Sequence, residues 1–449
     1  MVRVLVVDDS TFMRSAIAAL LEKDPEISVC GTAKDGQDCL AKAAQLQPDI
    51  ITLDVEMPRM DGLTTLKELM RTNPLPVLMV SSLTAEGAET TLKALEYGAL
   101  DFIAKVSGAD QEDFGTELRH KVKSIARRKA FLRLRYTRTN LESGRSGVTG
   151  VAGLSAPATG VAGNAVAGAG MTRGVKTALS AGRSATVPLG GHAGGGATGN
   201  GQRPSTRPAA PVFPSAAASH AGGTGSASAS PAFSSTAAAH AGGASSASAS
   251  TIIHPCTGTH DIVVIGVSTG GPPVVQKILS SLPADFPACI LVAQHMPASF
   301  TGPFAKRLDG VCRLKVTEAV NGDKIQNGRA YVCPGGKHIG IQMRGPLPEV
   351  LVTTEPTSAL YKPSVNVLME TAGNGLGRRV LGVMLTGMGS DGCDGARVLK
   401  QRGGYLIAQN EASCVVYGMP KAVVDAGLAD QILDVEDIAK AIMACVKGC

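Results

Sequence analysis

A serine, a histidine and an aspartate each follow an apolar segment in the second half of the chain. Ser268 lies in the turn GVSTGG, His295 closes ACILVAQH, and Asp391 lies in TGMGSDG after VLGVML. A serine becomes a nucleophile when a histidine takes its proton, and a carboxylate fixes the tautomer of that histidine. Because the carboxyl ends of parallel strands share one edge of a sheet, we expect these side chains to meet as a hydrolytic triad.

Each of these residues also has a plain structural interpretation. Ser268 or Asp391 would cap the helix that follows it, and His295 would be a buried structural histidine. GVSTGG fits the G-x-S-x-G pattern of a strand-to-helix turn with an exposed serine, but its glycines could instead hold a nucleotide phosphate. Against nucleotide binding, the sequence lacks the third glycine of the dinucleotide-binding pattern and an acidic residue at the end of the second strand.

Other assignments would give the chain a different chemistry. His338 could be the base with Asp309 or Asp323 as its partner, although neither aspartate ends an obvious parallel strand. A signalling adaptor without catalysis would not need Ser268. A DNA-binding regulator would need a C-terminal recognition helix, which this strand-rich region does not offer.

Polar residues also follow the strand-like segments of the first half. Converging carboxylates need a cation, and a set of oxygen ligands suits Mg²⁺. A carboxylate beside the metal could form an aspartyl-phosphate, with a lysine and a hydroxyl contacting the phosphoryl oxygens. The residues are Asp8 and Asp9 after the first segment, Asp54 after the third, Ser81 and Ser82 after the fourth, and Lys105 after the fifth.

The segments around these residues alternate between strand and helix. This alternation predicts two α/β domains with doubly wound parallel sheets. In the first half the predicted strands are 2–8, 28–33, 49–54, 76–82 and 101–105, and the predicted helices are 11–23, 38–46, 63–71 and 88–97. In the second half the predicted strands are 261–267, 288–295, 328–334, 339–343, 349–354, 380–387 and 404–409, and the predicted helices are 273–281, 365–372, 395–401 and 438–446.

The segment between the halves, from about residue 140 to 258, consists mainly of Ala, Gly, Ser, Thr and Pro. A tandem repeat, 211–230 and 231–250, has one Phe in each copy, too little apolar bulk for a core, so we predict a disordered linker. Residues 143–260 hold six basic residues and no acidic one, which accounts for the whole net charge of +6. The charge is therefore no sign of a nucleic-acid-binding face.

Membrane-spanning and secreted classes do not fit the sequence. No apolar run approaches the roughly 20 residues that span a bilayer, and two aspartates interrupt the apolar N-terminal run. Ten cysteines without a C-x-x-C pair or zinc-ligand spacing indicate reduced thiols, so we expect a cytoplasmic protein. The basic residues of 117–138 favour the solvated face of a terminal helix over a partner site, since no helix-turn-helix pattern follows.

The first half resembles the receiver domain of bacterial response regulators, a flavodoxin-like fold, over about residues 1–125. The matching segments are VLVVDDS, DIITLDVEMPRMDGL, PVLMVSS and GALDFIAK, with Val106 where the family usually has proline. The resemblance implies that Asp54 is the phosphoacceptor. The other implied residues are the Mg²⁺ ligands Asp8, Asp9, Asp54 and the Glu56 carbonyl, the phosphoryl contacts Ser81 and Lys105, and the switch aromatic Phe102.

The second half resembles the catalytic domain of bacterial chemotaxis protein-glutamate methylesterases/protein-glutamine glutaminases, the CheB family. The matching segments are IGVSTGGP, VAQHMP, YVCPGGKHI, YKPSVNVLMETA, VMLTGMGSDG and AQNEASCVVYGMPKAVVDAG. Asn366 stands where the family often has aspartate. The resemblance implies a nucleophile, Ser268, a general acid/base, His295, its orienter, Asp391, and an oxyanion hole formed by the backbone amides of Thr269 and Met388.

Together the two resemblances imply a phosphorylation-activated serine hydrolase. The predicted regions are a receiver (1–125), a helical extension with the disordered linker (126–258) and a methylesterase domain (259–449). The implied reactions are demethylation of glutamate methyl esters and deamidation of specific glutamines on cytoplasmic chemoreceptor domains, for chemotaxis adaptation. The expected partners are methyl-accepting chemoreceptors and the histidine kinase of the pathway as phosphodonor, with no nucleic acid and no membrane insertion.

The resemblances also imply a cofactor and a mode of control. We expect Mg²⁺ in the receiver and no cofactor in the catalytic domain. In the family the unphosphorylated receiver covers the active site. A long linker raises the entropic cost of that docking, so we expect weaker inhibition here.

Overall fold

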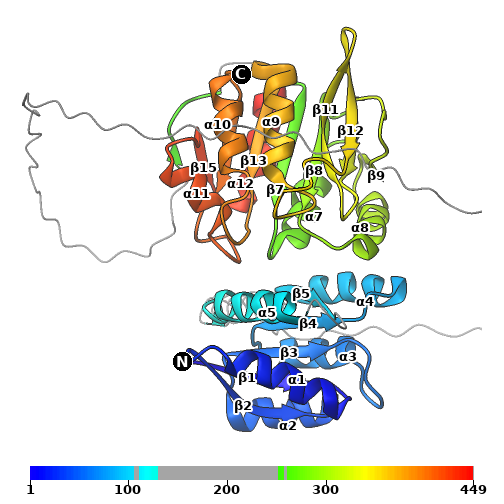
Figure 1. The fold of residues 1–449 in the computed structure, drawn as a ribbon, viewed down its shortest axis with the longest axis vertical. Helices are drawn as coiled ribbons and strands as arrows, with labels where there is room; N and C mark the ends of the chain where they lie inside the picture. The colour runs from blue at the N-terminus through cyan, green and yellow to red at the C-terminus, as the bar shows by residue number, and fades with distance from the viewer. Residues whose placement is uncertain (106–110, 130–250, 257–259, 448–449) are drawn as a thin grey trace, which may run out of the picture. The chain divides into compact units, whose positions relative to one another are not determined.

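The computed structural model describes residues 1–105, 111–129, 251–256 and 260–447 (Figure 1). Val106 and most of the predicted linker, 130–250, lie outside the described residues. The described residues form a five-stranded sheet in the first half, and an eight-stranded and a two-stranded sheet in the second. None of the described helices is long and apolar enough to cross a membrane.

The first half folds into a parallel sheet with the strand order β2-β1-β3-β4-β5. Its strands are β1 (Val2–Val7), β2 (Ile27–Ala33), β3 (Ile50–Asp54), β4 (Val77–Ser81) and β5 (Asp101–Ala104). Its helices are α1 (Thr11–Glu22), α2 (Gly36–Leu46), α3 (Gly62–Thr72), α4 (Ala85–Glu96) and α5 (Gln111–Ala126). All five predicted strands and all four predicted helices are confirmed, and α5 covers the described start of the basic segment 117–138.

Side-chain alternation along β1 explains the two covered faces of this sheet. Val4 and Val6 pack in one buried cluster with residues of α1 and α5, whereas Leu5 and Val7 belong to a cluster with residues of α2, α3 and α4. Successive residues of a strand point to opposite faces, so a fully apolar strand must be covered on both sides. Asp8, at the carboxyl end of β1, lies just beyond this covered apolar stretch.

The second half contains a larger doubly wound sheet with the order β6-β15-β14-β13-β7-β8-β10-β9. All neighbouring strands are parallel except β6, which runs antiparallel to β15. Residues 251–252, which lie within the predicted linker, thus belong to this sheet. The strands are β6 (Thr251–Ile252), β7 (Ile262–Val267), β8 (Cys289–Gln294), β9 (Lys315–Glu318), β10 (Arg329–Val332), β13 (Val380–Met384), β14 (Tyr405–Gln409) and β15 (Gln431–Leu433).

Helices cover both faces of this sheet, as predicted. Buried residues of α9, α10 and α11 pack with Val264 and Leu291 on one face, and those of α7, α8 and α12 pack with Val263 and Ile265 on the other. Figure 1 shows α9 and α10 lying over β13 and β7. The helices are α7 (Gly271–Ser281), α8 (Ala298–Val311), α9 (Val365–Leu376), α10 (Cys393–Gln401), α11 (Met419–Asp425) and α12 (Val435–Lys447), with a 3₁₀ turn at Gly377–Arg379.

This half differs from the prediction at a hairpin and at five strands and helices that were not predicted: β6, β9, β15, α8 and α11. The predicted strands 339–343 and 349–354 do form strands, β11 (His338–Arg344) and β12 (Leu347–Thr353), but as a separate antiparallel hairpin that packs on α9. Helix α8 was not predicted, because Gly302, Pro303 and Gly310 lower its helix propensity. Its buried stripe of Phe300, Phe304 and Leu308, spaced four residues apart, offsets that cost by packing on the sheet.

Candidate active site

Three neighbouring strands bring Ser268, His295 and Asp391 to one edge of the large sheet. Ser268 follows β7 directly, His295 follows β8 directly, and Asp391 lies in the loop between β13 and α10. The backbone holds the first two in place, because the Ser268 amide donates to the Thr386 carbonyl and the His295 amide to the Val267 carbonyl, each at 3.0 Å. The convergence expected from the strand ends is therefore present.

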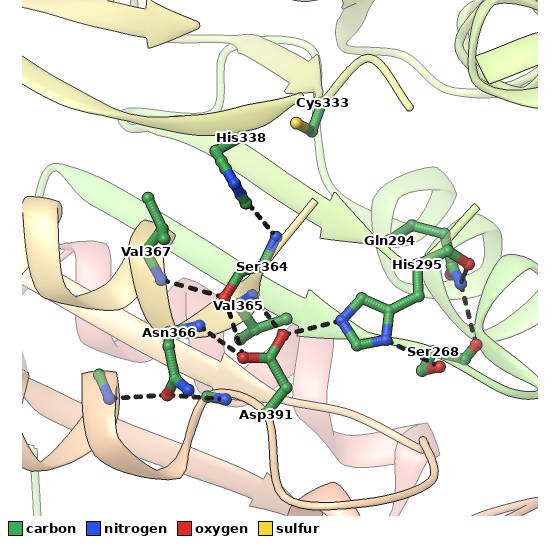
Figure 2. A network of polar contacts seen from close by, with 12 residues as sticks. Ser268, Gln294, His295, Cys333, His338, Ser364, Val365, Asn366, Val367 and Asp391 are labelled. Atoms are coloured by element: carbon green, nitrogen blue, oxygen red, sulfur yellow. Dashed lines mark hydrogen bonds and ion pairs between the residues drawn. The ribbon is translucent and has the colours of Figure 1, made fainter. Parts of the chain in front are cut away.

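The three side chains form a continuous chain of hydrogen bonds (Figure 2). His295 Nε2 lies 2.8 Å from Asp391 Oδ2, and His295 Nδ1 lies 3.2 Å from Ser268 Oγ. A carboxylate can only accept, so Nε2 carries the proton and donates to Asp391. Nδ1 is then the free acceptor that receives the Ser268 hydroxyl proton.

Asp391 is held by donors on both of its oxygens. Oδ2 also accepts from the Val365 amide at 2.7 Å, and Oδ1 accepts from the Ser364 hydroxyl at 3.0 Å and the Asn366 amide at 3.1 Å. Burial by itself raises the pKa of Asp391, but the hydrogen bonds from His295 and from these amides outweigh it and hold the pKa below its usual value. Asp391 therefore stays ionised beside the imidazole.

The glycine-rich loops bring backbone amides close to Ser268. A Cβ on Gly387 would lie 2.8 Å from Ser268 Cβ and 2.3 Å from Met419 Sδ, so only glycine lets this loop approach the serine. Among the described residues, neither the Thr269 amide nor the Met388 amide donates to a protein acceptor. Both N–H groups can therefore donate to a bound ligand.

The structure does not support His338 as an alternative base. His338 is fully buried, its Nδ1 accepts from the Ser364 amide at 3.1 Å, and its Nε2 lies 3.3 Å from the Pro356 carbonyl. The two proposed partners are engaged elsewhere, since Asp309 pairs with Lys315 and Asp323 accepts from the Val320 amide. That option is wrong because both ring nitrogens of His338 already face backbone groups.

Several residues near the triad were not singled out from the sequence. The Tyr361 ring stacks on the His295 ring, with centroids 4.4 Å apart and planes 14° apart. The Gln294 amide donates to the carbonyls of Ser268 (2.9 Å) and His295 (3.1 Å) and so fixes both backbones. Ser364 is the N-cap of α9, and a serine just before an apolar helical run is a signal that could have identified it.

Asn366 acts as a support for the loop that carries Asp391. Its side-chain oxygen accepts from the amides of Gly392 and Gly395, both at 2.9 Å. These bonds need only an acceptor, which asparagine and aspartate both provide. The difference from the common family residue therefore leaves the hydrogen bonds intact.

The first half carries a second polar cluster at the carboxyl edge of its sheet. Lys105 Nζ lies 2.9 Å from Asp8 Oδ2 and 2.8 Å from Asp54 Oδ2. Burial raises the pKa of Asp54 to about 6, although Lys105 opposes the rise, and Asp8 adds to it. Lys105 thus compensates two buried carboxylates only in part.

The donor set of this cluster fits a divalent cation. Asp8, Asp9 and Asp54 each offer an oxygen, and these atoms lie within 4.8 Å of one another. Asp8 Oδ2 is buried, and the Lys105 ammonium 2.9 Å away is its counter-charge among the residues that the structure describes. Carboxylate oxygens of this kind are the ligands that Mg²⁺ prefers.

The other predicted receiver residues lie around this cluster. Glu56 lines the same open pocket as Asp9. Phe102 lies on β5 and is buried. The Ser81 hydroxyl accepts from Thr91 Oγ1 at 2.7 Å and lies 3.2 Å from the Gly87 carbonyl, so among the described residues it is bonded to the α4 side and not to Asp54 or Lys105.

Known proteins resemble the chain over both halves. The family model for CheB methylesterase matches residues 263–442, and that for the response regulator receiver domain matches residues 4–113. A protein-glutamate methylesterase/protein-glutamine glutaminase 2 of Nitratidesulfovibrio vulgaris is 51% identical over 99% of both chains. The chain belongs to the CheB methylesterase family.

A second curated relative and a solved catalytic domain are also similar to this chain. A protein-glutamate methylesterase/protein-glutamine glutaminase 1 of Oleidesulfovibrio alaskensis is 47% identical, over 99% of this chain and 100% of that protein. The crystal structure of the Thermotoga maritima CheB methylesterase catalytic domain is 38% identical, covers 41% of this chain and 98% of that one, and has a TM-score of 0.40. The region matched by the methylesterase model contains Ser268, His295 and Asp391.

Proposed function

We propose that the chain is a phosphorylation-activated serine hydrolase that demethylates glutamate methyl esters, and deamidates specific glutamines, on the cytoplasmic domains of chemoreceptors. The observation that carries this proposal is the unbroken chain of contacts from Ser268 through His295 to Asp391. The names of the relatives supply the substrate class, since they are protein-glutamate methylesterases and protein-glutamine glutaminases. We assign a receiver to residues 1–125 and a methylesterase domain to residues 259–449, to which the strand β6 at 251–252 is added.

The proposed reaction begins at the Ser268 hydroxyl. His295 Nδ1 takes the proton while Oγ attacks the ester carbonyl, and Asp391 stabilises the imidazolium that forms. The Thr269 and Met388 amides bind the oxygen anion of the tetrahedral intermediate. The imidazolium then protonates the leaving methoxide, and methanol departs from the acyl-enzyme.

Water completes the reaction. His295 takes a proton from the water as it attacks the acyl carbon, then returns a proton to Ser268 Oγ as the glutamate carboxylate leaves. Deamidation of a glutamine follows the same steps with ammonia as the first leaving group. Every step uses one acid/base and one nucleophile of the chain, and no cofactor is assigned to this domain.

Asp54 is the proposed phosphoacceptor, with a histidine kinase of the chemotaxis pathway as its phosphodonor in the cytoplasm. Asp8, Asp9, Asp54 and the Glu56 carbonyl would hold Mg²⁺, which when bound neutralises charge on the transferring phosphoryl group. Lys105 and Ser81 would contact the phosphoryl oxygens, for which the Ser81 hydroxyl must turn away from its bond with Thr91. Phosphorylation of Asp54 would then change the position of the switch aromatic Phe102 and relieve the inhibition of the active site by the receiver.

Methanol release from a methylated chemoreceptor tests the proposal. Ser268→Ala is expected to lower kcat by on the order of 10⁴-fold or more, because the nucleophile is lost. Asp54→Ala is expected to keep the basal rate but to lose stimulation by a small phosphodonor. Hydrolysis that survives in Ser268→Ala would overturn the assignment of the nucleophile, and normal stimulation of Asp54→Ala would overturn that of the phosphoacceptor.

A further inference from the structure

The position of Asp391 is not set by its own strand. β13 ends at Met384, and the loop that follows passes through Gly389 and Gly392, both with positive φ, before α10 begins. Such a loop does not by itself hold a carboxylate to within the tolerance of a hydrogen-bonded triad. The contacts that hold the Asp391 carboxylate in place must therefore come from another element.

That element is the first turn of α9. Ser364 at its N-cap, and Val365 and Asn366 after it, supply three of the four hydrogen bonds to Asp391. The fourth comes from His295. The negative charge also lies at the N-terminus of a 12-residue helix, where it is favoured electrostatically.

The Ser364 hydroxyl has two partners in this turn. It donates to Asp391 Oδ1 at 3.0 Å, and it accepts from the Val367 amide at the long distance of 3.5 Å. An N-cap serine ordinarily makes its strong bond to the helix amide. Here the geometry favours the bond to the carboxylate, so Ser364 holds Asp391 more than it caps the helix.

His338 contacts the backbone of Ser364 (Figure 2). The Ser364 amide donates to His338 Nδ1, so Nδ1 must lack a proton and Nε2 must carry it toward the Pro356 carbonyl. Burial lowers the pKa of His338, which keeps the ring neutral. His338 is the first residue of β11, so this contact connects the hairpin to the turn of α9 that holds Asp391.

We propose that Ser364, and behind it His338, are positioning residues for the reaction. His338 fixes the backbone of Ser364, and the hydroxyl of Ser364 and the amides that follow it fix the Asp391 carboxylate toward His295. The inference rests on the proposed function of the triad. The proposed contacts run from His338 on the hairpin through Ser364 and Asp391 to His295 and the nucleophile. A change at His338 therefore alters kcat and not substrate binding.

Two isosteric substitutions in the full-length protein separate positioning from packing. His338→Asn and His338→Leu have side chains of the same shape, but only asparagine places an acceptor where Nδ1 stands. We expect His338→Leu to lower kcat for methanol release roughly ten- to hundredfold with little change in KM, because a buried amide loses its partner and Asp391 loses its alignment. His338→Asn is expected to restore kcat to within about threefold of the wild type.

A matched control probes the same interface without touching Asp391. Thr371 Oγ1 accepts from the Ile341 amide and so joins α9 to β11 near His338. Thr371→Val removes that hydroxyl, and we expect a lower melting temperature with unchanged kcat. Ser364→Ala supplies a second test should His338→Leu fail to fold, with the same expected fall in kcat at constant KM.

The outcomes distinguish this inference from the proposed function. If wild type is active and Ser268→Ala is not, the triad stands. Equal kcat in His338→Leu and His338→Asn, or wild-type kcat in Ser364→Ala, would then overturn the positioning role. Activity that persists in Ser268→Ala would instead overturn the proposed function itself.

Discussion

Two buried aspartates in this chain have pKa values shifted in opposite directions. Both are desolvated, which raises the pKa of a carboxyl group, but Asp391 accepts four hydrogen bonds and Asp54 has mainly the ammonium of Lys105. The pKa of Asp391 is therefore lowered, whereas that of Asp54 rises to about 6. Asp391 suits a permanently charged partner of His295, and Asp54 suits a group that gains a cation before it reacts.

The raised pKa of Asp54 predicts a pH-dependent effect on stability. A carboxyl group whose pKa is higher in the folded state than in the unfolded state stabilises the fold below about pH 4 and loses that contribution as pH rises through about 6. Asp54→Asn should therefore raise the free energy of unfolding of the receiver by about 3 kcal/mol at pH 7.5 in chelator. The gain should vanish near pH 4.

Calorimetry of the full chain over that pH range measures the difference. Asp9→Asn is the matched control, because it removes an equal charge from an exposed position of the same cluster. If the wild-type receiver were more stable than the Asp54→Asn receiver at pH 7.5 without Mg²⁺, the prediction would be contradicted.

At the scale of elements, α9 supports its neighbour α10. The N-cap of α10 is Gly392, which has no side chain to satisfy the first amides of the helix. Asn366 on α9 supplies that acceptor for Gly392 and Gly395. One turn of α9 thus holds Asp391 directly and also holds the start of the helix behind it.

Asn366→Ala is expected to weaken both functions of that turn. Two amides lose their acceptor, so the free energy of unfolding should fall by about 1–3 kcal/mol, and kcat should fall because the Asp391 loop is released. Asn366→Asp keeps the acceptor and places a charge at the N-terminus of α10, so it should retain stability and turnover. Urea unfolding and methanol release check both variants, and an alanine variant as stable as the wild type would refute the capping role.

At the scale of the whole molecule, the chain has two doubly wound sheets, and each gathers polar residues at the carboxyl ends of its strands. Asp8, Asp54 and Lys105 meet at the edge of one sheet, and Ser268 and His295 at the edge of the other. The second sheet begins with β6 at residue 251, so the acid-free segment joins the two sheets only up to that point. Regulation across that segment is part of the proposed function.

Linker length should set the basal activity if the receiver inhibits by docking. Shortening residues 143–250 about tenfold lowers the entropic cost of docking by about 2 kcal/mol. We therefore expect the unphosphorylated rate of methanol release to fall up to roughly thirtyfold and the stimulation by a phosphodonor to rise in proportion. A linker of unchanged length and scrambled order is the control, and an unchanged basal rate in the short variant would argue against docking.

The sequence by itself determined the first sheet, five strands of the second, and the residues at their edges. Apolar segments followed by Ser268, His295, Asp54 or Lys105 are local patterns, and parallel strands must end at a common edge, so the convergence could be predicted. The predicted strands 339–343 and 349–354 show the limit, because the same apolar pattern suits a hairpin as well as a sheet strand.

Only the tertiary structure decided how the side chains at those edges are held. The ring nitrogen of His295 that faces Ser268, the stacking of Tyr361 and the support of Asp391 by α9 depend on contacts between segments far apart in the chain. Such contacts arise from the packing of one element on another, which leaves no periodic signal in the sequence. The elements and the identity of the triad are thus local properties, whereas the alignment of the triad is a property of the packed fold.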